Sequence, residues 1–268
     1  MEGSTKKSVE VLVMRHAESV FNKVHEEWAA ANNQPREHMG KDIRFASEPK
    51  EIIDALLTDQ GIDQCKKANQ EILGKYKNIK YVLVSPLRRT VATALEAMKD
   101  FPTDTEWRVL PWLREALTSN CDVAVHSIEY LKEHPHIKHD ELEGDNLWFL
   151  KYYHECPDAQ HQAKLLKRYE ESPAVETILD YMSEAYPNME RPFQLDFRAN
   201  KVREAVRKFI EEKTTQGVEV NDNEILLVSH YRLIKHLYGA FDESGTLIPG
   251  MEWACLNNAE IKPYSLEL

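Results

Sequence analysis

Three short apolar runs, each expected to form a buried β-strand, constrain the fold of this chain more than any other feature. They occupy residues 9–14, 81–85 and 224–228 and consist largely of valine, leucine and isoleucine. A run this short does not by itself distinguish a strand from a buried helix. However, stretches with helical periodicity separate the runs, as in parallel sheets whose strands are joined by crossover helices. The sequence therefore predicts an α/β fold, a three-layer α/β/α sandwich with a mostly parallel central sheet.

Helices and further strands are expected to complete this pattern. The expected helices cover residues 19–31, 58–76, 87–99, 195–213 and 231–238, and the additional strands cover residues 106–110, 252–256 and 261–266. Prolines break the segment 117–192 into helical patches, and we interpret it as a helical insertion or cap over the site. Residues 32–50 are polar and predict a long surface loop. Residues 1–268 are thus expected to form a single domain.

Composition limits the classes of partner. The net charge is −11, from 34 basic and 45 acidic residues, and no basic block stands out. Non-specific binding to nucleic acid is therefore not expected. No apolar stretch resembles a signal peptide or a membrane span, and the four cysteines form no CxxC pair. We expect a cytoplasmic protein without a membrane partner, and the sequence predicts no oligomeric state.

Basic residues follow each of the three buried runs. Arg15 and His16 follow the first run, Arg88 and Arg89 lie just after the second, and His230 follows the third. Taken alone, each is equally well an ordinary polar strand end. The carboxyl ends of parallel strands meet at one edge of a sheet, where α/β proteins bind ligands. The sequence therefore predicts a positively charged pocket in an acidic protein.

Histidine and arginine side chains gathered in this way suit phosphoryl chemistry. Arginine keeps its charge and makes bidentate contacts with phosphate oxygens. A neutral imidazole is a good nucleophile near pH 7, and a carboxylic acid is needed to protonate the leaving group. No metal or other cofactor is required if arginine and imidazolium groups stabilise the charge.

Four sequence blocks, in the same order, resemble the phosphoglycerate-mutase-like branch of the histidine phosphatase superfamily. They are MRHAESVFN at residues 14–22, DALLTDQGIDQC at 54–65, VSPLRRTVATA at 84–94 and LLVSHYRLIKHL at 226–237. The closing segment, residues 256–266, resembles the final strand pair of that family. Cys121-Asp122 and the later GDNLWF resemble plant and fungal phosphatase-like members. The resemblance implies a phosphatase fold spanning nearly the whole chain.

The resemblance also implies a two-step reaction. His16 attacks the phosphoryl group and forms a phosphohistidine. Arg15, Arg89 and His230 hold the phosphate oxygens, and Asn22 assists. This reaction would make the chain a phosphomonoesterase acting on a phosphorylated small molecule or phosphoprotein, with inorganic phosphate as product.

The proton donor is assigned to Glu115. The segment LREAL at residues 113–117 matches the position of the family's acid. Glu141 and Glu143 lie in the same variable region and are the alternatives.

Three further residues are assigned to substrate binding. Ser19 also has the common alternative role of a helix cap. Arg88 is alternatively a solvated helix residue or a supporting cation. Tyr231 stands where the family often has glycine, so its side chain either points away or narrows the pocket.

Three other functions and one other site stay open. A phosphoglycerate-type mutase would transfer phosphate between positions, but the LNERHYG block of mutases is absent, and a non-catalytic homologue would only bind phospho-ligands. Fructose-2,6-bisphosphatase activity also stays open, although no Walker sequence of a kinase half is present. A second cluster invites a metal-site interpretation, but Pro135 interrupts it and we expect a solvated loop and no bound metal; its members are His134, His136, His139, Asp140 and Glu141.

Overall fold

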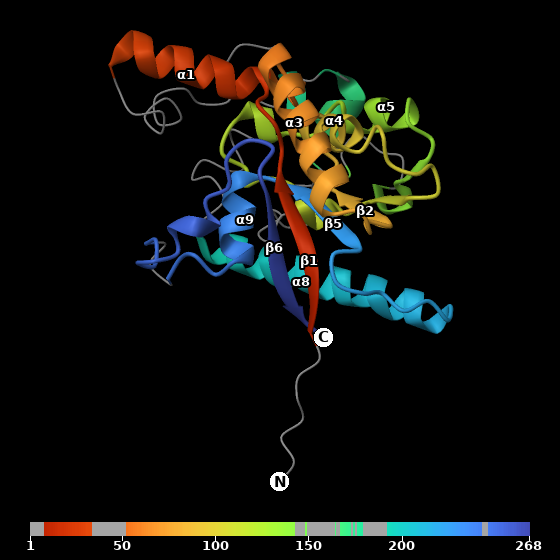
Figure 1. The fold of residues 1–268 in the computed structure, drawn as a ribbon. Helices are drawn as coiled ribbons and strands as arrows, with labels where there is room; N and C mark the ends of the chain where they lie inside the picture. The colour runs from red at the N-terminus through yellow and green to blue at the C-terminus, as the bar shows by residue number, and fades with distance from the viewer. Residues whose placement is uncertain are drawn as a thin grey trace.

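Six strands form one sheet at the centre of the molecule (Figure 1). A computed structural model describes residues 8–33, 52–142, 148, 164, 167–172, 174, 176–178, 192–242 and 246–268. The strands are β1 (Ser8–Arg15), β2 (Tyr81–Val84), β3 (Glu106–Val109), β4 (Ile137–Lys138), β5 (Ile225–Ser229) and β6 (Ile261–Glu267). Their order is β4-β3-β2-β5-β1-β6, and every neighbouring pair is parallel except β1 and β6. The predicted mostly parallel sheet is confirmed.

Helices cover both faces of this sheet (Figure 1). Side chains point alternately to the two faces of β1. Val9, Val11 and Val13 pack toward α8 and α9 on one face, whereas Leu12 and Met14 pack toward α3, α4 and α5 on the other. Strands buried on both faces need apolar residues at successive positions, which explains the continuous runs in the sequence. The helices are α1 (Val20–Asn32), α3 (Asp59–Lys75), α4 (Arg88–Ala97), α5 (Ser127–Lys132), α8 (Pro192–Thr215) and α9 (Tyr231–Leu237). The three-layer sandwich is confirmed.

One expected strand is absent. Residues 252–256 were predicted to be extended, but Glu252–Ala254 form the 3-10 turn η8. The backbone N–H groups of Ala254 and Cys255 donate to carbonyls three residues earlier. Leu256 is buried against the α8 and α9 layer, so its apolar character serves packing and not a strand pairing. An apolar segment was therefore mistaken for a strand.

The segment 117–192 begins as part of the main core. Its described portion contains the 3-10 turn η5 (Asn120–Asp122), α5, the unpredicted strand β4 and the 3-10 turn η6 (Asp140–Leu142). Ile137 of β4 pairs with Trp107 of β3, and Ile128 of α5 joins the same core cluster as α3 and α4. A two-residue strand is too short to show a sequence pattern. Most of residues 143–191 lies outside the described residues, as do residues 34–50 of the expected surface loop.

No helix in the described ranges is long and apolar enough to cross a membrane.

Candidate active site

The predicted strand ends meet because β5 lies between β1 and β2. Arg15 pairs in register with Ser229, and Val84 pairs with Val228. The rings of His16 and His230 consequently lie with their centroids 5.1 Å apart. Two histidines separated by more than 200 positions in the sequence are thereby brought into contact.

The backbone and side chain of His16 are both fixed. Its N–H donates to the carbonyl of Ser229 (2.9 Å), and Nδ1 lies 2.7 Å from the carbonyl of Ala17. Because a carbonyl only accepts, Nδ1 carries the hydrogen and Nε2 of the neutral ring keeps its lone pair. Burial lowers the pKa of His16 well below its ordinary value, and Arg89 and Arg15 lower it further. The ring is therefore neutral near pH 7.

The loop after β1 is hydrogen-bonded to the start of α3. The carbonyl of Glu18 accepts from the N–H of Thr58 (3.1 Å), and the N–H of Glu18 donates to the side chain of Gln64 (2.8 Å). A Cβ added at Gly61 would lie 2.1 Å from the oxygen of Glu18, so only glycine fits this approach. Thr58 also caps α3 by accepting from the N–H of Gly61 (3.0 Å). These contacts explain the threonine, glycine and glutamine of the second sequence block.

A pocket of about 370 Å³ opens beside His16. Six predicted site residues line it: Arg15, His16, Asn22, Arg89, Glu115 and Tyr231. Five lining residues were not predicted: Phe21, His25, Thr118, Asp122 and Arg232. The pocket therefore gathers three arginines and two imidazoles, a lining that suits an anionic ligand.

Three predicted residues, His230, Ser19 and Arg88, are not among those that line the pocket. His230 is fully buried behind His16, and its Nε2 lies 2.7 Å from the hydroxyl of Ser85. Within the described part of the chain, Nδ1 of His230 has no hydrogen-bond partner. Burial lowers the pKa of His230 well below its usual range, and Arg89 and His16 add to the effect.

Ser19 supports Asn22. It stands at the N-cap of α1, and both its N–H (3.0 Å) and its hydroxyl (2.9 Å) donate to Oδ1 of Asn22. The amide nitrogen of Asn22 is then the end of the side chain left to donate a hydrogen bond to a ligand. Ser19 thus has the capping role that was its alternative interpretation.

Arg88 supports the loop before α3. Its N–H donates to the carboxylate of Asp54 (3.0 Å), and Nε donates to the Asp54 carbonyl (2.6 Å). Asp54 is fully buried and also accepts from the hydroxyl of Ser127 (3.1 Å). These contacts hold Arg88 away from the pocket. The structure therefore favours the alternative interpretation, in which Arg88 is a supporting cation and not a substrate contact.

Arg15 and Tyr231 form one wall of the pocket. A terminal nitrogen of Arg15 donates to the carbonyl of Leu256 (3.0 Å), and its Cζ lies 4.9 Å from the Tyr231 ring centroid. Lys235 Nζ lies 4.1 Å from the same centroid. Contact with two cations holds the tyrosine ring in place. Tyr231 therefore narrows the pocket instead of pointing away from it.

Arg89 is anchored by the loop that contains η5. One terminal nitrogen donates to the carbonyl of Cys121 (2.6 Å), and the other pairs with Oδ1 of Asp122 (2.9 Å). Both charged side chains are almost completely buried. Among the described residues, Nε of Arg89 has no partner. Arg89 itself lines the pocket, so its fixed charge lies where an anion would bind.

Glu115 is buried at the pocket wall. Its carboxyl oxygens accept from the N–H of Ala116 (2.8 Å) and of Arg232 (3.3 Å). Burial raises the pKa of Glu115, and the neighbouring charge of Asp122 raises it further. Glu141 lines a different pocket, with residues of β3 and α8, and Glu143 lies outside the described residues. Glu115 is thus placed to hold a proton beside His16.

The lining residues that the sequence did not predict differ in how strong a sequence signal they carry. Phe21 and His25 lie four positions apart on α1, so helical spacing places them on one face, and their ring centroids are 4.1 Å apart. Arg232 follows His230 by two positions. Asp122 is the last residue of the 3-10 turn η5, which is too short for spacing to predict a side-chain orientation. Its role depends on the tertiary contact with Arg89.

The histidine-rich segment after α5 is not arranged as a metal site. The rings of His134 and His136 lie 6.3 Å apart, and they pack against Tyr130 and Trp107. In the described part of the chain, no three histidine, cysteine, aspartate or glutamate side chains are grouped closely enough to hold a metal ion.

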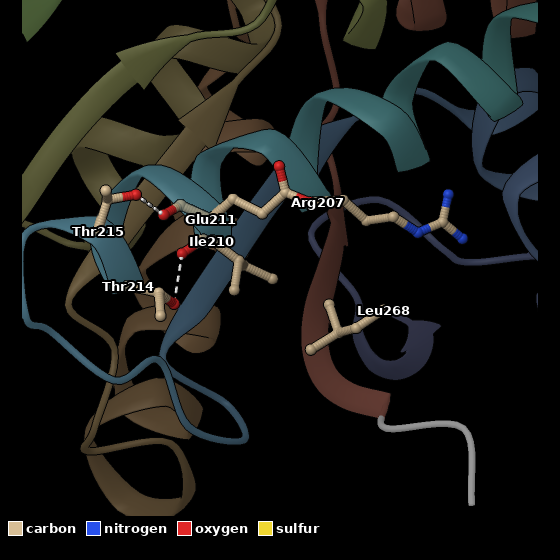
Figure 2. Close-up of a pocket in the computed structure, with 6 residues that line it drawn as sticks. All are labelled: Arg207, Ile210, Glu211, Thr214, Thr215 and Leu268. Carbon is tan, nitrogen blue, oxygen red and sulfur yellow. Dashed lines mark hydrogen bonds between the residues drawn. The ribbon is translucent and has the colours of Figure 1, made fainter. Parts of the chain in front are cut away.

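A second hollow lies where the C-terminal half of α8 passes the last residue of the chain (Figure 2). Its wall is formed by Arg207, Ile210, Glu211, Thr214, Thr215 and Leu268. The hydroxyls of Thr214 and Thr215 donate to carbonyls of the preceding helical turn, as Figure 2 shows. The two hydroxyls of this hollow are thus used within the helix, Arg207 donates to the carbonyl of Glu267, and none of the predicted site residues lines the hollow.

Comparison with known proteins supports the class of protein that this fold and pocket suggest. Residues 47–148 match the family model of the histidine phosphatase superfamily (branch 1). The match confirms over this segment, which includes Arg89 and Glu115, the resemblance seen in the sequence. The plant and fungal sub-branch is not distinguished. No curated protein matches the sequence.

Solved structures with a similar arrangement include three phosphoryl-handling proteins. Phosphoglycerate mutase from Bacillus anthracis str. Sterne is 15% identical, with 97% of this chain and 88% of that chain covered and a TM-score of 0.45. A mycobacterial glucosyl-3-phosphoglycerate phosphatase is 19% identical, with 97% and 91% covered and a TM-score of 0.45. A phosphoserine phosphatase mutant from Entamoeba histolytica, in complex with phosphoserine, is 15% identical, with 95% and 89% covered and a TM-score of 0.43.

Proposed function

We propose that this chain is a phosphomonoesterase of the histidine phosphatase superfamily that works through a phosphohistidine on His16. The observation that carries the proposal is the buried imidazole of His16, whose pKa is lowered by that burial. Its Nδ1 is tied to the carbonyl of Ala17, and the ring lines a pocket with Arg15 and Arg89. A nucleophilic nitrogen surrounded by fixed cations suits attack on a phosphate ester.

In the first step, Nε2 of His16 attacks phosphorus as the bond to the substrate's ester oxygen breaks. Glu115 transfers its proton to that oxygen, and the alcohol leaves. Arg15 and Arg89 stabilise the phosphoryl oxygens from the pocket wall, and Nδ1 of His230, which has no partner among the described residues, contributes from its place behind His16. The amide of Asn22 assists them. Fixed donors of this kind need no reorganisation during the reaction, which makes them effective.

In the second step, water replaces the alcohol. The ionised Glu115 removes a proton from the water as it attacks phosphorus, and the bond to Nε2 of His16 breaks. Inorganic phosphate leaves, and both side chains return to their starting protonation states. The arginines supply the positive charge that a metal ion supplies in other phosphatases, so we infer that the reaction is metal-independent.

The substrate is a small phosphorylated molecule. A volume of about 370 Å³ is within the range of small-molecule sites, and the ring of Tyr231 forms part of the wall. The described cysteines, Cys65, Cys121 and Cys255, are thiols outside any disulfide, which supports a reducing, cytoplasmic setting. We also propose that the chain forms a single domain in which residues 117–192 are an insertion.

Purified protein is expected to hydrolyse p-nitrophenyl phosphate in the presence of EDTA. Release of p-nitrophenol and of inorganic phosphate should be equal, because water is the final acceptor. A bisphosphate primer should not turn the reaction into transfer between positions. No turnover over a wide pH range would contradict the proposed function, and loss of turnover in EDTA would contradict metal independence.

Glu115→Gln is expected to separate substrates by their leaving groups. Glutamine cannot donate the proton, so hydrolysis of phenyl phosphate should fall by ~100-fold or more. First-step hydrolysis of p-nitrophenyl phosphate should fall much less, because p-nitrophenolate leaves without protonation. Single-turnover rates of the two esters measure this difference. Equal losses for both esters would exclude Glu115 as the proton donor.

A further inference from the structure

Asp122 is the most heavily contacted carboxylate of the pocket. Oδ1 accepts from Arg89 (2.9 Å) and from the thiol of Cys121 (3.2 Å). Oδ2 accepts from the N–H (3.0 Å) and hydroxyl (2.9 Å) of Thr118 and from the N–H of Ser119 (3.1 Å). Every one of these groups donates, which matches an ionised carboxylate that is held rigidly.

The orientation of Arg89 depends on this carboxylate. One terminal nitrogen is held by Asp122 and the other by the carbonyl of Cys121, so two points define the plane of the guanidinium group. Nε is then the donor without a partner among the described residues. Because the guanidinium group is planar, fixing its two terminal nitrogens also fixes the direction of the Nε hydrogen.

Asp122 and Glu115 form an unequal pair in the same pocket. Asp122 accepts five hydrogen bonds, including a charged one, whereas the carboxyl group of Glu115 accepts two from backbone N–H groups. Burial raises the pKa of Glu115 and the charge of Asp122 raises it further, whereas the N–H of Ala116 and the charges of Arg89 and Arg232 lower it. Two carboxyl groups whose surroundings differ in this way divide into one ionised and one protonated group.

We propose that Asp122 is a positioning residue of this site: its carboxylate orients Arg89 toward the phosphoryl group, and its negative charge keeps Glu115 protonated until the leaving group takes the proton. This inference rests on the proposed function. In this proposal Asp122 does not itself touch the substrate but sets the orientation of Arg89 and the protonation state of Glu115.

Asp122→Asn tests both parts of the inference. With phenyl phosphate as the probe, kcat/KM is expected to fall by ~10–100-fold, as for other residues that orient a site residue. The alkaline limb of the pH profile should also move to lower pH, because Glu115 loses a neighbouring negative charge and releases its proton more easily. A fall in rate at all pH values without that movement would overturn the role in holding the proton.

Asp122→Glu keeps the charge but displaces it by one methylene group. The expected result is a lower rate with the alkaline limb near its wild-type position, and an unchanged rate would overturn the positioning role. This variant carries the test if Asp122→Asn does not fold, which thermal unfolding will show. Asp196→Asn is the control, because Asp196 pairs with His236 outside the pocket and its loss should leave the limb in place.

The link to Arg89 is tested by combining substitutions. If Asp122 acts on the rate through Arg89, Asp122→Asn should add little to the loss caused by Arg89→Met. Full additivity would overturn the link. Absence of hydrolysis by the wild-type protein would contradict the proposed function, whereas an active wild type with an unaltered Asp122→Asn variant would contradict this inference alone.

Discussion

Replacement of His16 with alanine is expected to lower kcat for p-nitrophenyl phosphate by ~10⁴-fold or more, the scale on which loss of a nucleophile acts in other enzymes. The reason is that Arg15, Arg89 and Glu115 do not supply another nucleophile at this position. The protein should still fold, because alanine keeps the N–H donated to Ser229. Steady-state kinetics together with thermal unfolding measure both effects.

The matched control is another histidine. His136 is exposed and packs against Trp107, away from the pocket, so His136→Ala should retain activity. Wild-type protein quenched into base during turnover should contain phosphohistidine, and His16→Ala should contain none. Activity of His16→Ala within tenfold of wild type would exclude the phosphohistidine mechanism.

Arg89→Met is expected to reduce both activity and stability. Methionine fills much of the same volume but leaves the buried carboxylate of Asp122 without its cation. Breaking a buried ion pair from one side lowers the free energy of unfolding by about 3–5 kcal/mol. The loss of one fixed phosphate-binding donor should lower kcat/KM by ~100-fold or more. Chemical denaturation and kinetics below the transition midpoint separate the two quantities.

Arg88→Met is the neighbouring control. The Arg88 side chain donates to backbone carbonyls of Ile53 and Asp54 and lies outside the pocket. We expect some loss of stability and unchanged kcat/KM for the folded protein. Comparable loss of kcat/KM in the two variants would show that the arginines share the site, contrary to the proposed arrangement.

Local patterns predicted most of the fold. The runs at residues 9–14, 81–85 and 224–228 became β1, β2 and β5, because strands buried on both faces require uninterrupted apolar sequence. The helix beginning near Thr58 was correctly predicted from a capping residue followed by helical spacing. The strand predicted for residues 252–256 was wrong because a short apolar segment packs equally well as a 3-10 turn.

The sequence also predicted six of the residues that line the pocket, but not how each one lies there. Parallel topology brings Arg15, His16 and His230 to one edge, and motif spacing favoured Arg89 over Arg88. The side-chain contacts of Arg88, the wall formed by Tyr231 and the place of His230 behind His16 depended on packing between layers. A motif specifies which residue type is needed, whereas packing determines where its side chain can go.

The sequence by itself therefore determined the layered α/β fold and the cations and imidazoles at its strand ends, because both follow from short-range periodicity and parallel-sheet topology. Only the tertiary structure decided that Glu115 shares the pocket with Asp122 and that Asp122 holds Arg89. That ion pair joins Arg89 of α4 to Asp122 of the 3-10 turn η5, 33 positions later in the sequence. No periodic pattern links such positions, since loop conformation is set by the hydrogen bonds and burial that the folded chain provides.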